Sequence, residues 1–240
     1  MQTIIFDVDD TLYDQFIPFQ LAFNYTFNYS LSHDELYHLF LASRDYSDQV
    51  FEAEQNGEIS SLALQIFRIT KACADLGLLI AEHEAIKFQQ CYQHFQTKIT
   101  LFPELYKALD WLMQQNVQIG ILTNGNTEHQ QMKIDQLLLQ KWVQPAHTFI
   151  SASIGHAKPS IELFRFIEGQ MQLDRGQTWY VGDSFTNDVM GAKQAGWQSL
   201  WFNHRYRKQP KDMPAPNLVA HSPDELLKAI RSLSTSKKSV

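Results

Sequence analysis

Short runs of apolar residues without helical spacing recur along the chain and alternate with amphipathic segments over most of its length. A continuous apolar run of this kind is typical of a strand that is buried on both faces of a parallel sheet. The pattern therefore predicts an α/β fold built on a parallel sheet. The predicted strands span residues 4–6, 117–122, 148–151, 178–181, 198–202 and 217–220.

Helix-start signals separate these runs in the second half of the chain. Pro103 suits the first position of a helix, and Ser160 is placed to cap another. Ser222, followed by a proline and two acidic residues, predicts the start of a final helix that continues through Ile230. We expect residues 234–240 to form a tail without regular structure.

Residues 15–99 have a different character, because strand signals disappear and helical periods replace them. Ser32 and Glu35 form a capping box ahead of an apolar helix face, and Asn56-Gly57 predicts a turn. A further helix is predicted from about residue 82 to 95. Such a block could simply cover one face of the sheet, but it is too long for an ordinary crossover connection. We therefore expect a separate helical domain.

Composition narrows the possible partners of this 240-residue chain. Twenty Lys and Arg against 26 Asp and Glu give a formal net charge of −6, which argues against binding a nucleic-acid polymer or an anionic membrane. No apolar run approaches the length of a membrane span and no secretory signal is visible, so we expect a cytoplasmic protein. Cys73 and Cys91 lack the spacing of a metal site, and we expect ordinary buried thiols.

The first strand leads directly into alternating carboxylates. Asp7 and Asp9 lie two residues apart, so both can point to one side of the chain where it leaves the strand. Open α/β sheets bind their ligands at that end of their strands. Two carboxylates this close repel each other unless a cation or a shared proton lies between them. The pattern favours a Mg²⁺-assisted site with a carboxylate nucleophile; the alternative is an acidic turn after an edge strand.

Polar residues also follow three later strands. Thr123 and Asn124 offer a hydroxyl and backbone N–H groups that suit a phosphate oxygen, although an ordinary turn is the better interpretation of this stretch taken alone. Lys158 immediately precedes a proline and a capped helix. Asp183 follows a strand and a glycine, with Asp188 one helical turn further on, and Asp183 alone could be a helix N-cap.

These segments, in this order, resemble the four motifs of the haloacid dehalogenase-like (HAD) superfamily. The first motif is Asp-x-Asp-x-Thr, the second a strand ending in Thr, the third a Lys-Pro pair and the fourth Gly-Asp-x-x-x-x-Asp. The resemblance covers about residues 1–14 and 100–230. It implies a Rossmann-like core formed by residues 1–14 and 100–240, and a helical cap formed by residues 15–99.

The resemblance also implies roles for individual residues. Asp7 would attack phosphorus, and Asp9 would protonate the leaving oxygen and later deprotonate water. Asp188 would orient Lys158 or the waters of the metal. The implied catalytic residues are Asp7, Asp9, Thr123 and Lys158; the implied Mg²⁺ ligands are Asp7, Asp183 and the backbone carbonyl of Asp9; the implied phosphate-binding residues are Thr11, Thr123, Asn124 and Lys158.

Substrate class is the least determined feature. The dehalogenase branch lacks an acid at the position of Asp9, because a halide needs no proton, so the resemblance favours a phosphatase. Asp10 replaces a glycine found in many sugar-phosphate mutases, which weakens a mutase interpretation. Residues 54–69 and 201–210 resemble bacterial pyrimidine 5′-nucleotidases. Sugar- or glycolate-type phosphatases and a catalytically silent binding module remain alternatives. We expect a small phosphorylated metabolite as partner and a monomer or homodimer.

Some residues near the predicted site are expected to have no catalytic role. His156 and His204 lie on loops at the site end of the predicted sheet, and we expect both to be solvated. The aromatic rings of Tyr13 and Phe16 could face a nucleobase, but rings at such positions are more often part of a hydrophobic core.

Overall fold

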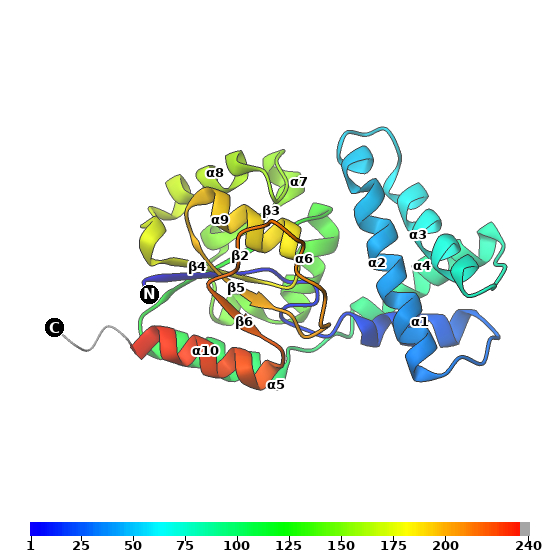
Figure 1. The fold of residues 1–240 in the computed structure, drawn as a ribbon, viewed down its shortest axis with the longest axis horizontal. Coiled ribbons are helices and arrows are strands. Elements are labelled where there is room, and N and C mark those ends of the chain that lie inside the picture. Colours follow the sequence, from blue (N-terminus) through cyan, green and yellow to red (C-terminus); the bar gives the residue numbers. More distant parts are fainter. Residues whose placement is uncertain (236–240) are drawn as a thin grey trace. The chain divides into compact units, whose positions relative to one another are not determined.

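The computed structural model describes residues 1–235, in which six strands form one parallel sheet (Figure 1). The strand order is β3-β2-β1-β4-β5-β6, and every neighbouring pair is parallel. This confirms the predicted α/β fold with a Rossmann-like sheet. Because the strands are parallel, the residues that follow them emerge along one edge. The strands are β1 (Thr3–Phe6), β2 (Gln118–Thr123), β3 (Thr148–Ile150), β4 (Thr178–Gly182), β5 (Gln198–Phe202) and β6 (Leu218–Ala220).

Strand β1 occupies the middle of the sheet and is buried along its whole length. Phe6, its last residue, lies opposite Ile121 of β2 on one side and Val181 of β4 on the other. The backbone N–H of Asp7 then donates a 2.9 Å hydrogen bond to the carbonyl of Val181. Asp7 is therefore the first residue beyond the strand and is held at the centre of the carboxyl edge.

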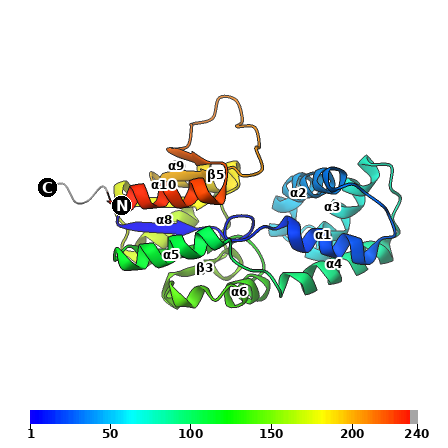
Figure 2. The ribbon, with the colours of Figure 1, turned by 90° about the horizontal axis from the view of Figure 1, so that it is seen from below.

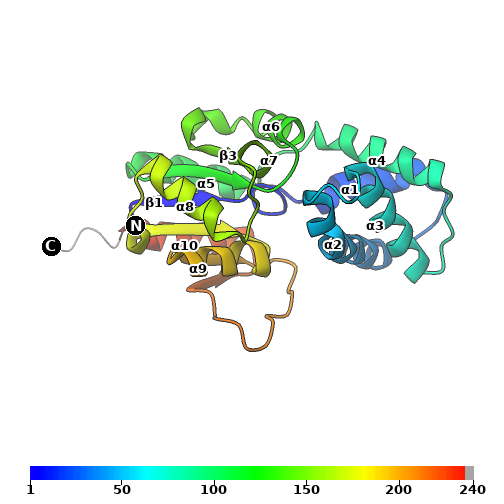
Figure 3. The same cartoon turned by 90° about the horizontal axis from the view of Figure 1, so that it is seen from above.

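Helices cover both faces of the sheet. Helices α5 (Pro103–Gln114) and α10 (Pro223–Thr235) contact each other on one face (Figure 2), whereas α8 (Ile161–Met171) and α9 (Gly191–Ala195) contact each other on the opposite face (Figure 3). Four apolar residues of α5 that recur at helical spacing are buried, namely Leu105, Ala108, Leu109 and Leu112. Two short helices complete this unit near β3, α6 (Thr127–Gln136) and α7 (Ser151–Ile154).

Several local predictions need correction. Ser160 precedes α8, but its hydroxyl hydrogen-bonds the carboxylate of Glu162 and makes no cap bond to the helix backbone. The strand predicted to end at residue 151 ends at Ile150, and Ser151 begins α7. The final helix continues to Thr235 rather than ending near residue 230. The tail predicted at residues 234–240 is wrong for its first two residues, which belong to this helix, and residues 236–240 lie outside the described residues.

Residues 15–99 form a second compact unit, while residues 1–14 and the chain from Thr100 onward form the unit that contains the sheet. Within residues 15–99 the long helices are α1 (Phe16–Thr26), α2 (His33–Gln55), α3 (Ser61–Asp75) and α4 (Glu82–Gln96). The predicted capping box at Ser32 is present, and Ser60 caps α3. The core of this unit is largely aromatic; Phe19, for example, packs edge-on against Phe40 and Phe88.

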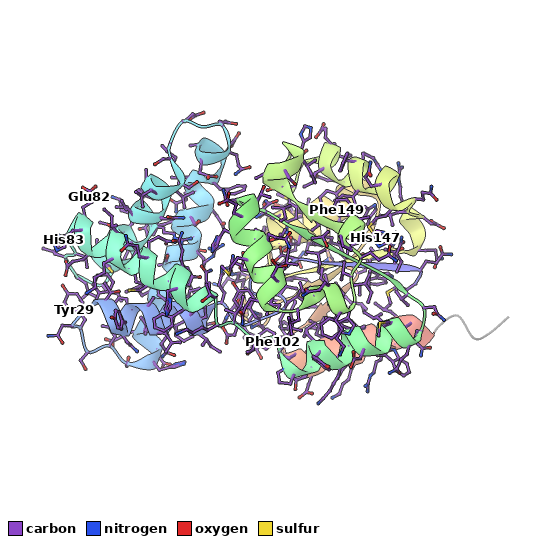
Figure 4. The ribbon with its side chains drawn as sticks, turned by 180° about the vertical axis from the view of Figure 1, so that it is seen from behind. Tyr29, Glu82, His83, Phe102, His147 and Phe149 are labelled. Carbon is purple, nitrogen blue, oxygen red and sulfur yellow. The ribbon has the colours of Figure 1, made fainter. Side chains whose placement is uncertain are left out.

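A hydrogen bond joins two loops at one end of this helical unit. The hydroxyl of Tyr29, which follows α1, donates to the carbonyl of Leu79, which precedes α4; Figure 4 labels Tyr29 and the first residues of α4 at this end. Both cysteines lie in this unit and are free thiols. None of the helices within residues 1–235 is long and apolar enough to cross a membrane.

Candidate active site at the carboxyl edge of the sheet

Three carboxylates from separate segments meet beyond the sheet. Asp7 follows β1, Asp183 follows β4, and Asp188 lies in the π-helical turn Phe185–Met190 that comes next. Each offers one oxygen, and these oxygens lie within 4.8 Å of one another. The turn is capped by Ser184, whose hydroxyl accepts from the backbone of Asn187. Asp183 is therefore not the helix cap, and its side chain belongs to the carboxylate group.

The ammonium group of Lys158 lies among these carboxylates and is buried. Its Nζ donates to Asp7 Oδ1 at 2.7 Å, to Asp188 Oδ1 at 2.7 Å and to the hydroxyl of Tyr180 at 2.9 Å. Tyr180 in turn donates to the backbone carbonyl of Leu122 at 2.8 Å, which fixes the direction of its hydroxyl. These acceptors match the three protons of an ammonium group. A ligand oxygen would therefore reach Lys158 by replacing one of them.

Burial and like charge dominate the electrostatics of this group. Burial raises the pKa of Asp7 to about 7, with contributions from Asp188 and Asp9, while Lys158 opposes the shift. Burial also raises the pKa of Asp183 well above its usual value, and Asp10 adds to this. For Lys158 burial acts in the opposite direction, but Asp188 and Asp7 outweigh it and keep its pKa well above the ordinary value.

The donor set suits a hard divalent cation. The oxygens of Asp7, Asp183 and Asp188 converge, and the ammonium group of Lys158 reaches Asp7 and Asp188. Carboxylate oxygens are the ligands that Mg²⁺ prefers, usually together with retained water. The predicted Mg²⁺ site therefore fits the chemistry of the residues that meet here. The carboxylate of Asp188 accepts from Lys158 through Oδ1 and from the backbone N–H of Ser184 through Oδ2.

The predicted phosphate-binding residues have different surroundings. Thr11 donates from its hydroxyl to Asp7 Oδ2 at 3.3 Å. The hydroxyl oxygen of Thr123 is buried and has no hydrogen-bond partner within the described chain. The side chain of Asn124 bonds the backbone of Lys158 on both sides, accepting from its N–H at 2.9 Å and donating to its carbonyl at 3.0 Å. Thr123 thus keeps an unused polar group at the site, whereas Asn124 holds the Lys158 loop in place.

Asp9 is bound by residues that the sequence analysis does not identify. Lys133 Nζ lies 2.7 Å from both carboxylate oxygens, Gln130 Nε2 donates at 2.9 Å, and the hydroxyl of Tyr13 donates as well. Burial would raise the pKa of Asp9, but Lys133 outweighs it and holds the pKa well below its usual range. Tyr13 is buried and donates to this carboxylate, so it is not available to face a nucleobase.

A weak sequence signal for this contact does exist on α6. The buried positions on α6 and just beyond it are Gln130, Lys133, Ile134 and Leu137, which recur at helical spacing. Two polar side chains on an otherwise apolar face imply polar partners inside the protein, because buried polar groups are normally paired. The spacing alone does not say which carboxylate they meet.

The residue after Asp9 is held by a second ionic cluster. Asp10 has a positive φ of 59°. Arg205 donates two hydrogen bonds to the carboxylate of Asp10, at 2.6 and 2.9 Å, and also pairs with Asp14. His204 Nε2 lies 2.9 Å from the backbone carbonyl of Asp10, and its ring stacks on Phe202. The expectation that His204 is solvated is therefore wrong, because the turn after β1 folds against it.

The other predicted loop histidine and the nearby aromatic rings lie as follows. His156 is exposed, as expected. Phe102, labelled in Figure 4, packs edge-on against Phe202 and His204 and so helps to hold His204 in place. Phe16 belongs to the aromatic core of the helical unit.

A family model for haloacid dehalogenase-like hydrolases matches residues 1–196. The chain therefore belongs to the haloacid dehalogenase-like hydrolase family, as its motifs predict, and is an enzyme of the hydrolase class. Its similar relatives include a pyrimidine 5′-nucleotidase, YjjG, of Escherichia coli, which is 29% identical over 93% of this chain and 95% of the relative. A glyceraldehyde 3-phosphate phosphatase of Methanothermobacter thermautotrophicus is 24% identical over 88% of this chain and 90% of its own length.

Solved structures of low sequence identity share the fold. The HAD-hydrolase YfnB of Bacillus subtilis, solved with bound magnesium, aligns with a TM-score of 0.73 at 22% identity, covering 95% of this chain and 98% of that one. L-2-haloacid dehalogenase of Xanthobacter autotrophicus aligns with a TM-score of 0.72 at 15% identity, covering 96% and 98%. The fold is thus shared with a HAD-hydrolase and with a dehalogenase, and the reaction has to be argued from the residues.

Proposed function

We propose that this protein is a Mg²⁺-dependent phosphomonoester hydrolase that works through an aspartyl phosphate on Asp7. The observation that carries the proposal is the convergence of Asp7, Lys158 and Asp183, with Asp9 two residues beyond the nucleophile. A dehalogenase would have no use for an acid at Asp9, because a halide leaves without a proton.

The two chemical steps follow from the groups present. A carboxylate oxygen of Asp7 attacks phosphorus, the ester P–O bond breaks, and its electron pair leaves on the alcohol oxygen. That oxygen takes a proton from Asp9, which must itself bind a proton before this step, because Lys133 holds its pKa low in the free protein. Water then attacks the same phosphorus while Asp9 accepts a proton from it. The bond between phosphorus and Asp7 breaks, which releases inorganic phosphate and restores the carboxylate.

Charge compensation is the main task of the surrounding residues. An anionic nucleophile facing an anionic ester is disfavoured by about 4 kcal/mol per charge pair at ~4 Å and an effective dielectric constant of ~20. Lys158 offsets part of this, and the Thr123 hydroxyl can donate to a phosphoryl oxygen. Asp7, Asp183 and the backbone carbonyl of Asp9 would hold Mg²⁺, which when bound supplies further positive charge. Asp188 keeps Lys158 directed at the nucleophile.

A pyrimidine nucleoside 5′-monophosphate is the substrate class we favour. The support is the match to YjjG, named a pyrimidine 5′-nucleotidase, over nearly the full length of both chains, together with the resemblance of residues 54–69. Sugar-phosphate or phosphoglycolate hydrolysis is the second candidate, because other relatives are named glyceraldehyde 3-phosphate phosphatase and phosphoglycolate phosphatase. These two relatives match 42% and 61% of the chain. The glyceraldehyde 3-phosphate phosphatase of Methanothermobacter thermautotrophicus matches 88% of it, at 24% identity against 29% for YjjG.

A panel of phosphate monoesters, assayed with Mg²⁺ and again after chelation with EDTA, tests both the phosphatase activity and the substrate class that we propose. We expect dUMP, UMP and dTMP to have the highest kcat/KM, and Asp7→Asn to abolish turnover of every ester. Higher values for sugar phosphates or phosphoglycolate would reject the nucleotidase assignment but keep the phosphatase. Wild-type protein that hydrolyses no ester in the panel would support a binding module instead.

A further inference from the structure

The carboxylate of Asp9 is held more firmly than proton transfer alone would require. Lys133 Nζ reaches both of its oxygens at 2.7 Å, and Gln130 Nε2 reaches Oδ2 at 2.9 Å. Both residues come from one face of α6, and the hydroxyl of Tyr13 donates to Oδ1 from the loop that contains Asp9 itself. Donors from two segments therefore fix the direction in which this carboxylate points.

The two residues of α6 are themselves anchored. Gln130 Nε2 also donates to the backbone carbonyl of Asn124 at 3.0 Å. The side chain lies so close to Gly125 that a Cβ there would be 2.9 Å from Gln130 Nε2, and the φ of Gly125 is +136°. Only glycine readily adopts this conformation while leaving room for the amide. Since Asn124 also bonds the backbone of Lys158, the start of α6 links the acid to the lysine loop.

Stability alone does not account for these side chains. The Oε1 atom of Gln130 is buried without a hydrogen-bond partner in the described chain, which is unfavourable for folding. Lys133 is almost fully buried, and buried ion pairs are often no more stable than apolar residues of similar volume. Two disfavoured burials on one helix face, both directed at the same carboxylate, indicate a role in the function of that carboxylate.

We propose that Gln130 and Lys133 are positioning residues that hold the carboxylate of Asp9 in line with the leaving oxygen of the ester. This inference rests on the proposed function, because it assigns Asp9 the transfer of a proton to that oxygen. Removal of either side chain would let the carboxylate rotate away. The loss would then depend on the leaving group, since an alkoxide needs the proton and an electron-poor phenolate does not.

The test uses aryl and arylalkyl phosphates of similar shape, namely 2,4-dinitrophenyl, 4-nitrophenyl, phenyl and benzyl phosphate. Because kcat/KM reports the formation of the phosphoenzyme, it isolates the step that Asp9 assists as an acid. For Lys133→Met we expect kcat/KM for benzyl phosphate to fall about 100-fold, and that for 2,4-dinitrophenyl phosphate to fall no more than about threefold. For Gln130→Leu we expect the same trend with a loss of about tenfold for benzyl phosphate.

Matched controls and a second readout separate positioning from general damage. Lys107→Met and Gln131→Leu remove exposed side chains of the same types and should leave all four rates unchanged. Thermal melting and circular dichroism establish whether each variant folds; if Lys133→Met does not, Gln130→Leu decides. An equal loss for all four esters, or no loss, in a folded variant would overturn the inference. Wild-type protein that hydrolyses none of the esters would instead reject the proposed function.

Discussion

The carboxyl edge of the sheet and the core of the helical unit bury very different side chains. At the carboxyl edge of the sheet the buried groups include Asp7, Lys158 and Asp188, which are ionic and paired with one another. The interior of the helical unit is built from aromatic and aliphatic side chains such as Phe40 and Phe88. Burying charge is unfavourable unless it is paired, whereas burying a ring such as Phe88 stabilises by about 1.5–3 kcal/mol. The comparison indicates that the reactive groups gather at the sheet edge, whereas the core of the helical unit consists mainly of groups that stabilise the fold.

Charged side chains at the sheet edge depend on one another because they are held in ion pairs, as Asp9 is with Lys133 and Asp10 is with Arg205. Removal of one partner leaves the other charge buried and uncompensated. Mutations at the sheet edge should therefore affect both activity and stability, and mutations in the helical core should affect stability alone.

The largest effect is expected for Lys158→Met. Loss of the ammonium removes the group that offsets charge on Asp7, so kcat/KM for 4-nitrophenyl phosphate should fall about 10³-fold. Without added divalent cation, the free energy of unfolding should fall by about 3–5 kcal/mol, because Asp7 and Asp188 lose their partner. Urea denaturation and steady-state kinetics measure both, with Lys107→Met as the exposed control. An unchanged stability would contradict the claim that Lys158 neutralises the buried carboxylates.

Phe88→Ala should have the opposite profile. The ring of Phe88 packs against Phe19 and Tyr92, and its removal should lower the free energy of unfolding by about 3–5 kcal/mol. At a temperature where the variant is folded, kcat/KM for 4-nitrophenyl phosphate should change by less than about threefold, because no group at the sheet edge is altered. Leu79→Ala, at a residue that is 86% exposed, is the control. A large loss of kcat/KM in folded Phe88→Ala would show that the units are not separate in function.

The smallest effect concerns the two thiols of the helical unit. Burial raises the pKa of Cys73 to about 12, with a further contribution from Glu84, so its thiolate is rare at pH 8. Cys91 is half-buried. We expect a disulfide-exchange reagent to label Cys91 and to leave Cys73 unlabelled in the folded protein, as measured by absorbance with Cys91→Ser and Cys73→Ser for assignment. Labelling of Cys73 at the rate seen in urea would contradict its burial.

The fold could be predicted because its signals are local. Apolar runs such as residues 198–202 identify strands, and residues such as Ser32 and Pro103 identify helix starts from a few neighbouring positions. Where a local prediction of the fold was wrong, the residue could form either of two local contacts. Ser160 could bond either the helix backbone or a neighbouring side chain, and it hydrogen-bonds Glu162. Local competition of this kind is characteristic of serine near helix ends.

The motif residues could be predicted because they follow strands or, like Lys158, precede a helix, but their partners could not. Lys133 contacts Asp9 across 124 residues, and Arg205 contacts Asp10 across 195. Nothing in the spacing of either pair indicates the contact, which arises from the order of the strands in the sheet. Tyr180 was predicted only as part of a buried strand, although its hydroxyl bonds Lys158. Residues that support a site from neighbouring elements are therefore the part that required the structure.

The central claim is that Asp7 becomes phosphorylated during turnover, and chemical trapping tests it most directly. The enzyme is mixed with 4-nitrophenyl phosphate and Mg²⁺, quenched within one turnover and reduced with borohydride, which converts an aspartyl phosphate to homoserine. Peptide sequencing by mass spectrometry then locates the modified residue. The account predicts homoserine at position 7 in the wild type and none in Asp7→Asn. Modification at Asp9 or Asp183, or turnover without any modified residue, would contradict it.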